Sequence, residues 1–423
     1  MRQMQESGIE WIGKIPTTWK INTMFQLFTQ IKNKNTDLQE QNLLSLSYGR
    51  IKRRSIDTTD GLLPESFDGY NIIEANDIIL RLTDLQNDHK SLRVGLATER
   101  GIVTSAYLTI RNCSESLTKY LYYYLHSFDI AKGFYGMGAG VRQGLNWDGI
   151  KWLKILTPSV SEQRRIVSFL DTECSRIDVA IEQTRASIEE YKKLKQAVIT
   201  QAVTKGIHPD HSMKDSGIEW IGNIPEEWEV FRIAALYSER KENGNDELPI
   251  LTVSINTGVS DRELSKDESE RVFVRSEDRS KYMRVYPGDL TYNMMRAWQG
   301  AFGAVRVDGM VSPAYVIVKP RREIDSRYME ALLRTQPAKE EMKRYSHGIA
   351  DFRLRLYWDK FRTIKVCFPP IEEQREIADY IDSKCAEIDE LIEKKEQFLA
   401  ELENYKKSMI YEYVTGKKEV PHS

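Results

Sequence analysis

The fold of this chain is decided by the segment Ser161–Thr204, which reads SEQRRIVSFLDTECSRIDVAIEQTRASIEEYKKLKQAVITQAVT. Mostly apolar positions recur along it in alternating steps of four and three residues, at Ile177, Ile181, Thr184, Ile188, Tyr191, Lys195, Val198 and Ala202. This heptad spacing, in a segment without Pro or Gly, predicts a long helix that packs along a partner helix. At about 1.5 Å per residue the helix would run roughly 66 Å, which is too long for one small globular domain to cover.

A later segment, Glu372–Thr415, repeats the pattern. Its matching positions hold Ile388, Ile392, Leu399, Leu402, Met409 and Tyr413, and the apolar stripe is widened by Leu391, Phe398 and Tyr405. Two such helices in one chain most simply pair with each other. The alternative, two unrelated amphipathic core helices, does not account for residue identities that go beyond apolar spacing.

These identities recur at a fixed offset in the sequence. Pro158–Ile166 reads PSVSEQRRI and Pro369–Ile377 reads PPIEEQREI, and both open with the Pro and acidic residues typical of a helix start. Farther along, the residues that align at the same offset are Asp171 with Asp382, Cys174 with Cys385, Ile177 with Ile388 and Asp178 with Asp389. The chain is therefore a tandem duplication.

A shorter repeat lies at the start of each copy. Ser7–Gly13 reads SGIEWIG and recurs unchanged as Ser216–Gly222, and each copy is followed by Ile-Pro and then by Trp19 or Trp228. The Gly and Pro residues predict a short strap, and the Trp side chains are expected to fill a core rather than to act in a functional site.

Between strap and long helix, each copy alternates short strands with helices. Strands are expected at Leu43–Tyr48, Asn76–Leu80, Ile250–Ile255 and Gly288–Tyr292, and helices at Leu117–Asp129 and Ser326–Arg344. The predicted class is α/β, with two similar globular domains at 1–158 and 223–369 and long helices at 159–206 and 370–416. A linker with the repeated strap is expected at 207–222 and a tail at 417–423.

Composition sets further bounds. The 423 residues are 41% hydrophobic and contain no run that approaches 18 apolar residues, which predicts a cytoplasmic protein without a membrane partner. Its four Cys, none in a C-x-x-C pair, suit a reducing compartment. The net charge of -2 argues against indiscriminate nucleic-acid binding. Because residues 370–416 carry 13 acidic and 6 basic side chains, the rest of the chain is basic.

Catalytic and metal motifs are missing from the sequence. It has neither a phosphate-binding G-x-x-x-x-G-K-[ST] loop nor an H-E-x-x-H pair, and its six His do not cluster. Gly136–Gly140 is predicted to be a flexible turn, because the second copy lacks these glycines. Cys174 and Cys385 are predicted to be buried thiols rather than metal ligands. The chain is therefore predicted to be no enzyme and to bind no cofactor or metal.

What remains is chemistry suited to DNA. Arg pairs with guanine, Asn and Gln pair with adenine, and Lys neutralises phosphate, although each such residue alone is more often a solvated surface group. The candidates follow the strands or precede the end of a globular domain: Arg50, Lys52, Arg53, Arg54, Arg81, Thr83, Gln86, Asn87, Lys90, Arg142, Asn293, Arg296, Trp298, Gln299 and Arg353. The loops differ between the copies while the frame repeats, as expected if the two copies read different sequences.

The helix-entry motif, the repeated strap and the doubled order of globule and helix resemble the specificity subunit of type I restriction-modification systems. The resemblance covers essentially the whole chain. It implies two target recognition domains, each reading one half of a split double-stranded DNA site, with the long helices packed antiparallel as a spacer and the halves related by a pseudo-twofold axis. The recognition loops are the variable part of the family, so the base-reading candidates rest on their chemistry alone.

The resemblance also implies partners. Two methylation subunits would dock on the helical region and carry S-adenosylmethionine, and endonuclease/translocase subunits would join for cleavage. Candidate partner-binding residues on the helices are Ile188, Tyr191, Phe398, Leu399, Leu402 and Tyr405. Two other functions stay open: a coiled-coil scaffold that joins protein partners without reading DNA, and a self-sufficient nuclease or methyltransferase.

Overall fold

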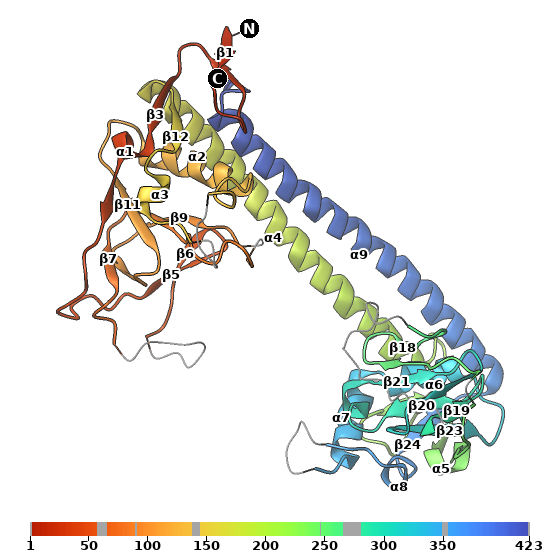
Figure 1. Ribbon diagram of the computed structural model, residues 1–423. Helices are drawn as coiled ribbons and strands as arrows, with labels where there is room; N and C mark the ends of the chain where they lie inside the picture. The colour runs from red at the N-terminus through yellow and green to blue at the C-terminus, as the bar shows by residue number, and fades with distance from the viewer. Residues whose placement is uncertain are drawn as a thin grey trace. The chain divides into compact units, whose positions relative to one another are not determined.

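The computed structural model describes residues 2–56, 66–88, 91–137, 144–245, 247–264, 281–348 and 354–421. The chain divides into two compact units (Figure 1). Unit 1 comprises Met1–Arg185 and Gln397–Ser423, and unit 2 comprises Ala186–Glu396. Each unit therefore contains one globule, the first part of one long helix and the last part of the other.

The central sheet has the same topology in both units. In unit 1 its order is β4-β11-β8-β9, formed by Phe28–Ile31, Leu108–Asn112, Ile78–Leu80 and Val94–Leu96. In unit 2 the order is β16-β23-β20-β21, formed by Tyr237–Glu239, Tyr315–Pro320, Leu290–Asn293 and Phe302–Ala304. All neighbouring strands in these two sheets are antiparallel. The duplication read from the sequence is thus also a duplication of strand order.

The smaller strand pairs repeat as well. In unit 1 they are β1 (Met4–Glu6) with β2 (Lys14–Pro16), β3 (Lys20–Thr23) with β12 (Lys154–Thr157), β5 (Leu44–Ser47) with β6 (Arg50–Arg53), and β7 (Asn71–Ile73) with β10 (Gly101–Val103). In unit 2 they are β13 (Met213–Asp215) with β14 (Asn223–Pro225), β15 (Glu229–Arg232) with β24 (Lys365–Phe368), β17 (Val253–Ser254) with β18 (Gly258–Val259), and β19 (Met283–Val285) with β22 (Gly309–Val311).

Two elements differ from the sequence-based expectation. The expected strand Ile250–Ile255 is paired in β17 only at Val253 and Ser254, because the chain turns back at once to form β18. The single helix expected at Ser326–Arg344 is wrong. The structure has α6 (Ser326–Leu333) and α7 (Gln336–Tyr345) instead.

The break between α6 and α7 has a local cause. Thr335 leaves the helical region, with φ -62° and ψ 155°, and its hydroxyl accepts a hydrogen bond from the backbone N–H of Ala338 at 3.4 Å. Pro337 follows in the first turn of α7, where its missing N–H costs no helical hydrogen bond. In unit 1 the corresponding helix, α2 (Thr118–Ile130), is continuous. The short helices are α1 (Met24–Leu27), α3 (Trp147–Ile150), α5 (Ile233–Leu236), α8 (Trp358–Phe361) and η2 (Ala297–Gln299).

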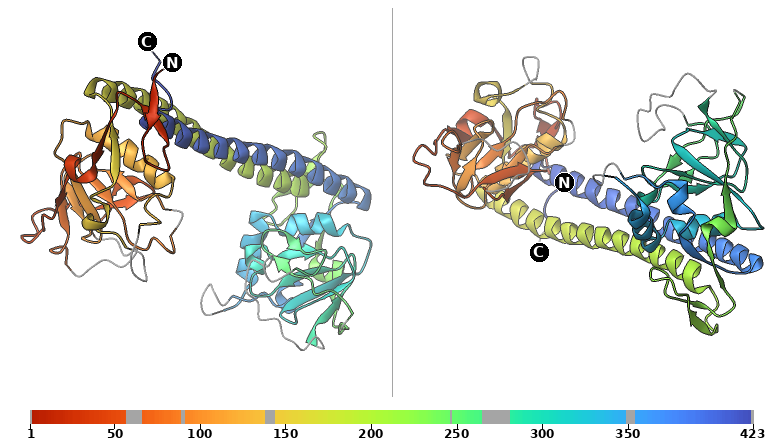
Figure 2. Two further views of the ribbon diagram at one scale, coloured as in Figure 1. Left: turned by 45° about the horizontal axis from the view of Figure 1, so that its top comes forward. Right: turned by 90° about the horizontal axis from the view of Figure 1, so that it is seen from below.

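The long helices, α4 (Val160–Lys205) and α9 (Ile371–Val414), pack together and antiparallel within each unit (Figure 2). In unit 1 the rings of Phe169 and Tyr413 lie 4.5 Å apart, and Lys406 Nζ lies 2.6 Å from Asp178 Oδ1. In unit 2 Lys195 Nζ lies 2.6 Å from Asp389 Oδ2. Residue numbers fall along α9 as they rise along α4, which confirms the predicted antiparallel pair.

The ion pairs show why a duplicated helix pairs with its own copy. Asp178 aligns with Asp389 and Lys195 aligns with Lys406 in the internal repeat. The Asp178–Lys406 pair of unit 1 and the Asp389–Lys195 pair of unit 2 are therefore the same interaction made twice, each with one residue from each copy. Antiparallel pairing of two copies produces this reciprocity automatically.

The predicted seam is confirmed by burial. All eight heptad positions of α4 are buried or half-buried, as are the six seam positions of α9. Side chains of both helices join the core of unit 1, which includes Ile177, Ile181, Met409 and Ile410. Among the described residues, no helix combines the length and the hydropathy that a membrane span requires.

Candidate nucleic-acid interface

Each strap is fastened to a long helix by its Trp. Trp19 is buried, and its Nε1 donates to Glu162 Oε2 at 3.2 Å in the first turn of α4. Trp228 is fully buried, and its Nε1 donates to Glu373 Oε2 at 2.8 Å in the first turn of α9. The core role predicted for both Trp residues is confirmed. The Glu of each helix-entry motif, Glu162 or Glu373, accepts the hydrogen bond of the Trp indole.

The Gln of the same motif fastens the globule. Gln163 Oε1 accepts from the backbone N–H of Leu117 at 2.8 Å, and its Nε2 donates to the Pro158 carbonyl at 2.9 Å. In unit 2 Gln374 Oε1 accepts from the N–H of Asp325 at 3.1 Å, and its Nε2 donates to the Pro369 carbonyl at 2.8 Å. Leu117 and Asp325 cap α2 and α6, so both motifs satisfy an otherwise unpaired helix terminus.

A third repeated contact joins each globule to the other copy's helix. The hydroxyl of Tyr120 in α2 donates to the carbonyl of Val414 at the end of α9, at 3.1 Å. The hydroxyl of Tyr328 in α6 donates to the carbonyl of Val203 near the end of α4, also at 3.1 Å. Both Tyr side chains are fully buried, and burial raises their pKa well above the usual value, so they stay protonated donors.

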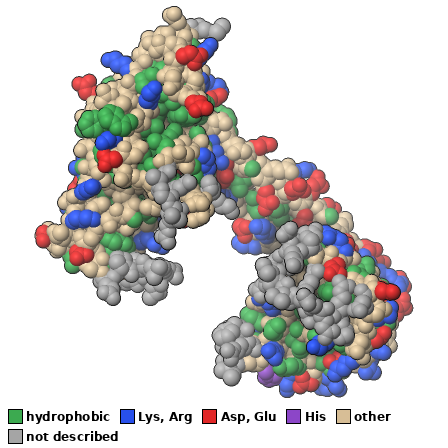
Figure 3. Space-filling view, viewed as in Figure 1, with side chains coloured by type: hydrophobic (Ala, Val, Ile, Leu, Met, Phe, Trp, Pro, Cys, Tyr) green, Lys and Arg blue, Asp and Glu red, His purple; other side chains and the backbone are tan. Residues whose placement is uncertain are grey.

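In unit 1 four of the basic candidates lie on or directly after the hairpin of β5 and β6. Arg50 forms an ion pair with Asp178 of α4 at 3.2 Å, and Arg53 Nε donates to Glu99 Oε1 at 2.8 Å, so both charges are partly neutralised within the unit. Lys52 and Arg54 are exposed. On the face shown in Figure 3, basic and acidic side chains are interspersed over unit 1 and over unit 2.

The hairpin also presents an aromatic side chain that the sequence reasoning missed. Tyr48 and Gly49 form its two-residue turn with φ values of 47° and 76°, which is the left-handed pair that a type I′ turn requires. The Tyr48 side chain is 73% exposed at this tip. The Tyr-Gly pair between a short apolar strand and a basic strand was the signal available in the sequence.

The recognition candidates of the loop after β8 are arranged around a residue that was not predicted. Arg93 is fully buried, and its guanidinium donates to the backbone carbonyls of Arg81, Thr83, Asp84 and Asp88 and to the hydroxyl of Tyr135. A buried guanidinium is tolerated because its donors are satisfied in this way. The loop therefore wraps around Arg93, and the sequence offers no local signal for that role.

The candidates of that loop differ in their exposure to solvent. Thr83, Gln86 and Asn87 are exposed, and Asn87 Nδ2 donates to Asp84 Oδ1 at 2.8 Å. Arg81 is half-buried, with its Nη2 3.6 Å from Asp88 Oδ2. Three predicted residues, Lys90, Arg142 and Arg353, lie outside the described residues.

In unit 2 the corresponding loop is compact. Asn293 is buried, and its Oδ1 accepts from the N–H of Met295 at 2.9 Å, so its amide shapes the turn instead of projecting from it. Arg296, Trp298 and Gln299 are half-buried around η2. Trp298 Nε1 donates to the Met295 carbonyl at 3.2 Å, and Lys343 Nζ lies 5.3 Å from the centre of the Trp298 rings.

We compared the chain with known proteins. No protein-family model matches the chain. It is 25% identical to the type I restriction enzyme MjaVIII specificity subunit of Methanocaldococcus jannaschii, over 96% of this chain and 94% of that protein. It is also 25% identical to the MjaX specificity subunit of the same organism, over 96% of this chain and 95% of that protein.

Solved structures share the fold. A chain of a type I restriction-modification system, from a study of complex assembly and conformational transition, superposes with a TM-score of 0.66 at 14% identity, over 96% of this chain and 99% of that one. The HsdS subunit of Thermoanaerobacter tengcongensis superposes with a TM-score of 0.51 at 14% identity, over 98% of this chain and all of that one. Over nearly its whole length, this chain is therefore similar to type I restriction-modification specificity subunits.

The partner-binding candidates on the long helices fall into two groups. Ile188 is buried, and Tyr191, Leu399 and Leu402 are half-buried; Leu399 and Leu402 pack against the core of unit 1. By contrast, Phe398 and Tyr405 are 49% and 61% exposed. Leu391, 41% exposed, lies seven residues before Phe398, and Tyr405 lies seven after it. These three side chains thus form a stripe of exposed apolar groups at heptad spacing on α9, where Tyr380 is also exposed.

Burial shifts the pKa of several titratable groups in both units. Burial raises the pKa of the Cys174 thiol to about 11 and also raises that of Cys385, and each packs beside the core of a different unit. In the part of the chain that the structure describes, no group of three or more His, Cys, Asp or Glu could hold a metal ion. In unit 1, burial raises the pKa of Asp129 to about 6 and lowers that of His126 to about 4.

Proposed function

We propose that this chain is a specificity subunit that recognises a bipartite DNA site, with each globule reading one half-site. The observation that carries the proposal is a repeated frame with unlike loops at one equivalent position. The central-sheet strands β8 and β20 occupy the same place in the strand order, yet residues 81–88 wrap around Arg93, while the loop after β20 contains η2 (Ala297–Gln299). A fixed frame with different hydrogen-bonding groups suits two different base sequences.

We assign the candidates of each unit either to contacts with base edges or to contacts with phosphates. In unit 1, Thr83, Gln86 and Asn87 offer hydroxyl and amide groups to base edges, while Lys52 and Arg54 neutralise phosphates. In unit 2, Arg296 and Gln299 are the base-reading candidates. Asn293 is buried, so its contribution is to hold the turn that presents them.

The helices set the spacing and dock the partners. A continuous antiparallel pair can act as a ruler between half-sites because a helix rises by a fixed length per residue. The stripe of Leu391, Phe398 and Tyr405 offers apolar surface to further helices, which we assign to the methylation subunits. These subunits bring S-adenosylmethionine, endonuclease/translocase subunits complete the assembly, and the specificity subunit itself performs no chemistry.

A domain exchange tests half-site reading. Residues 14–158 are replaced by the corresponding part of a relative, and the chain is expressed with its methylation subunits. Sequencing of the methylated bases should then show one changed and one retained half-site, because each globule carries its own loops. A change in both half-sites would contradict independent reading. An absence of salt-dependent duplex binding would instead favour a scaffold that joins proteins without contacting DNA.

A further inference from the structure

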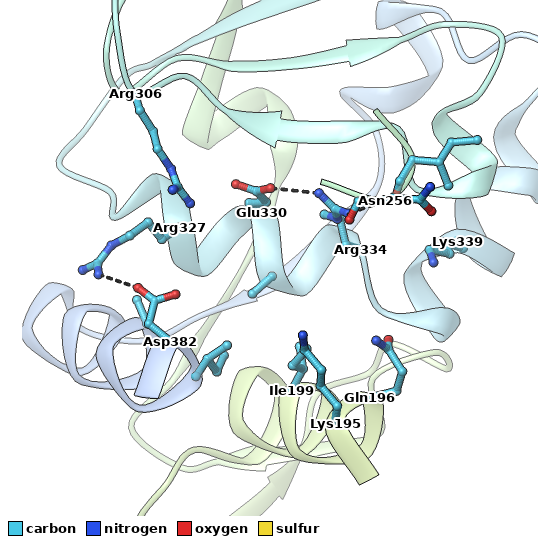
Figure 4. Close-up of a pocket in the computed structure, with 14 residues that line it drawn as sticks. Lys195, Gln196, Ile199, Asn256, Arg306, Arg327, Glu330, Arg334, Lys339 and Asp382 are labelled. Carbon is cyan, nitrogen blue, oxygen red and sulfur yellow. Dashed lines mark hydrogen bonds and ion pairs between the residues drawn. The ribbon is translucent and has the colours of Figure 1, made fainter. Parts of the chain in front are cut away.

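Unit 2 contains a cavity of about 450 Å³ between its globule and its helix segments (Figure 4). Its cationic lining side chains are Lys195, Arg306, Arg327, Arg334 and Lys339, against the carboxylates of Glu330 and Asp382. The volume lies within the range of small-ligand sites in proteins. The excess of positive charge identifies the kind of ligand to consider.

Three of these cations are already neutralised or hydrogen-bonded by the unit itself. Lys195 Nζ lies 2.6 Å from Asp389 Oδ2, and Arg327 Nη1 lies 2.8 Å from Asp379 Oδ1. Arg334 Nη1 donates to Glu330 Oε1 at 3.0 Å, and its Nη2 donates to two backbone carbonyls. These three side chains line the cavity, and their positive charges are largely compensated by partners within unit 2.

The other two cations differ. Among the residues that the structure describes, no ion pair is found for Arg306 or Lys339. Figure 4 shows Arg306 and Lys339 on different sides of the cavity. Lys339 is half-buried, and burial together with the charge of Arg334 lowers its pKa. Its stem passes against Gly300, where an added Cβ would lie 2.5 Å from Lys339 Cε, so the left-handed Gly300 makes room for it.

Unit 1 carries a larger side chain at one position of the equivalent wall. Tyr120 and Tyr328 make the same bond to the ends of the long helices, so α2 and α6 can be aligned residue by residue. On that alignment Tyr123 of unit 1 occupies the place of Ala331. Tyr123 is buried and its hydroxyl donates to Asp171 Oδ1 at 2.7 Å, so unit 1 has a buried aromatic ring where the cavity of unit 2 is lined by the small side chain of Ala331.

We propose that the cavity of unit 2 binds a phosphate-bearing anion between Arg306 and Lys339. Two uncompensated cations match a dianion, and a guanidinium can hold a phosphate through two parallel hydrogen bonds. The phosphate belongs either to a small molecule or to a nucleic-acid backbone, because both present the same oxygens. The inference goes beyond the proposed reading of half-sites and does not depend on it.

Titration of the full chain with inorganic pyrophosphate, followed by calorimetry at constant ionic strength, tests this proposal. Saturable binding is expected for the unmodified chain. The double variant Arg306→Ala/Lys339→Ala should bind at least about tenfold more weakly, whereas Lys241→Ala/Lys319→Ala, which removes two exposed charges of unit 2 outside the cavity, should bind normally. Ala331→Tyr, which copies the unit 1 residue, should abolish binding while leaving the cations in place.

Competition with duplex DNA separates the two sources of phosphate. Displacement of pyrophosphate by the duplex assigns the site to a nucleic-acid backbone, and binding unaffected by the duplex assigns it to a small molecule. Lack of saturable binding by the unmodified chain would overturn the proposal, as would equal affinity of the two double variants. Melting curves verify folding, and the double variant provides the decision if Ala331→Tyr does not fold.

Discussion

Replacing Arg93 by Met would take away the charged group around which the unit 1 loop is wrapped. Five hydrogen bonds from the guanidinium would be lost. Because Thr83 is exposed and Arg81, Asp84 and Asp88 are only half-buried, water can reach some of the freed carbonyls. The cost is therefore nearer 0.6 than 2 kcal/mol per bond, or about 3 kcal/mol in total. Arg93→Lys keeps the charge but offers fewer donors, and should cost about half as much.

Hydrogen exchange measures this change directly. The amides of Asp88 and Leu145 donate to the carbonyls of Asp84 and Leu82 in the same loop region. A loss of about 3 kcal/mol corresponds to roughly a hundredfold faster exchange if these amides open with the loop. Amides of unit 2 provide the internal reference, and their exchange should not change.

The matched control is Arg100→Met. Arg100 is an exposed Arg of the same globule that pairs with Glu40 and Glu74, so its loss should cost at most about 1 kcal/mol. In a methylation assay, Arg93→Met should impair the half-site read by unit 1 and leave the other intact. Unchanged exchange at Asp88 and Leu145 in a folded Arg93→Met chain would refute the role assigned to Arg93.

Three further predictions follow from the same contacts. Burial raises the pKa of Asp129 to about 6, so the penalty for burying its carboxylate is relieved, and stability gained, as pH falls from about 6 toward 4. Burial lowers the pKa of His126 to about 4, so this residue destabilises the fold as pH falls from about 6.5 toward 4. The melting temperature of unit 1 should therefore fall more steeply on acidification in Asp129→Asn than in the unmodified chain. Parallel plots of melting temperature against pH would contradict this. Asp178→Asn removes the partner of both Lys406 and Arg50 and should destabilise unit 1 by about 1 kcal/mol, more than Asp389→Asn destabilises unit 2; thermal melting that ranks them in the reverse order would count against the bridging role of Asp178. Four helix-favouring residues inserted after both Glu189 and its repeat partner Ala400 add about 6 Å to each helix, so the gap between half-sites should grow by one or two base pairs of about 3.4 Å, and a methylome with the original gap would exclude the ruler.

The sequence by itself determined the features that arise from local periodicity and from repetition. The heptad spacing from Ile177 to Ala202 specifies a long helix with one apolar seam, whatever lies around it. The offset between Asp178 and Asp389 shows that a second helix matches the first, so the pairing of the two helices could be predicted, whereas their antiparallel direction was implied by the family resemblance. The break at Thr335 also had a local signal in Pro337, and the single-helix prediction overlooked it.

Only the tertiary structure decided the roles of Arg93, Asn293 and Ala331. Whether an Arg contacts DNA or holds a loop depends on which carbonyls surround it, and those of Arg81 to Asp88 come together only when the loop folds. Asn293 was a reasonable base reader by residue type, but burial directs its amide to Met295. Ala331 lines a cavity in unit 2, whereas the aligned Tyr123 of unit 1 is a buried ring bonded to Asp171. Side-chain chemistry is local, but burial and neighbours are properties of the packed chain.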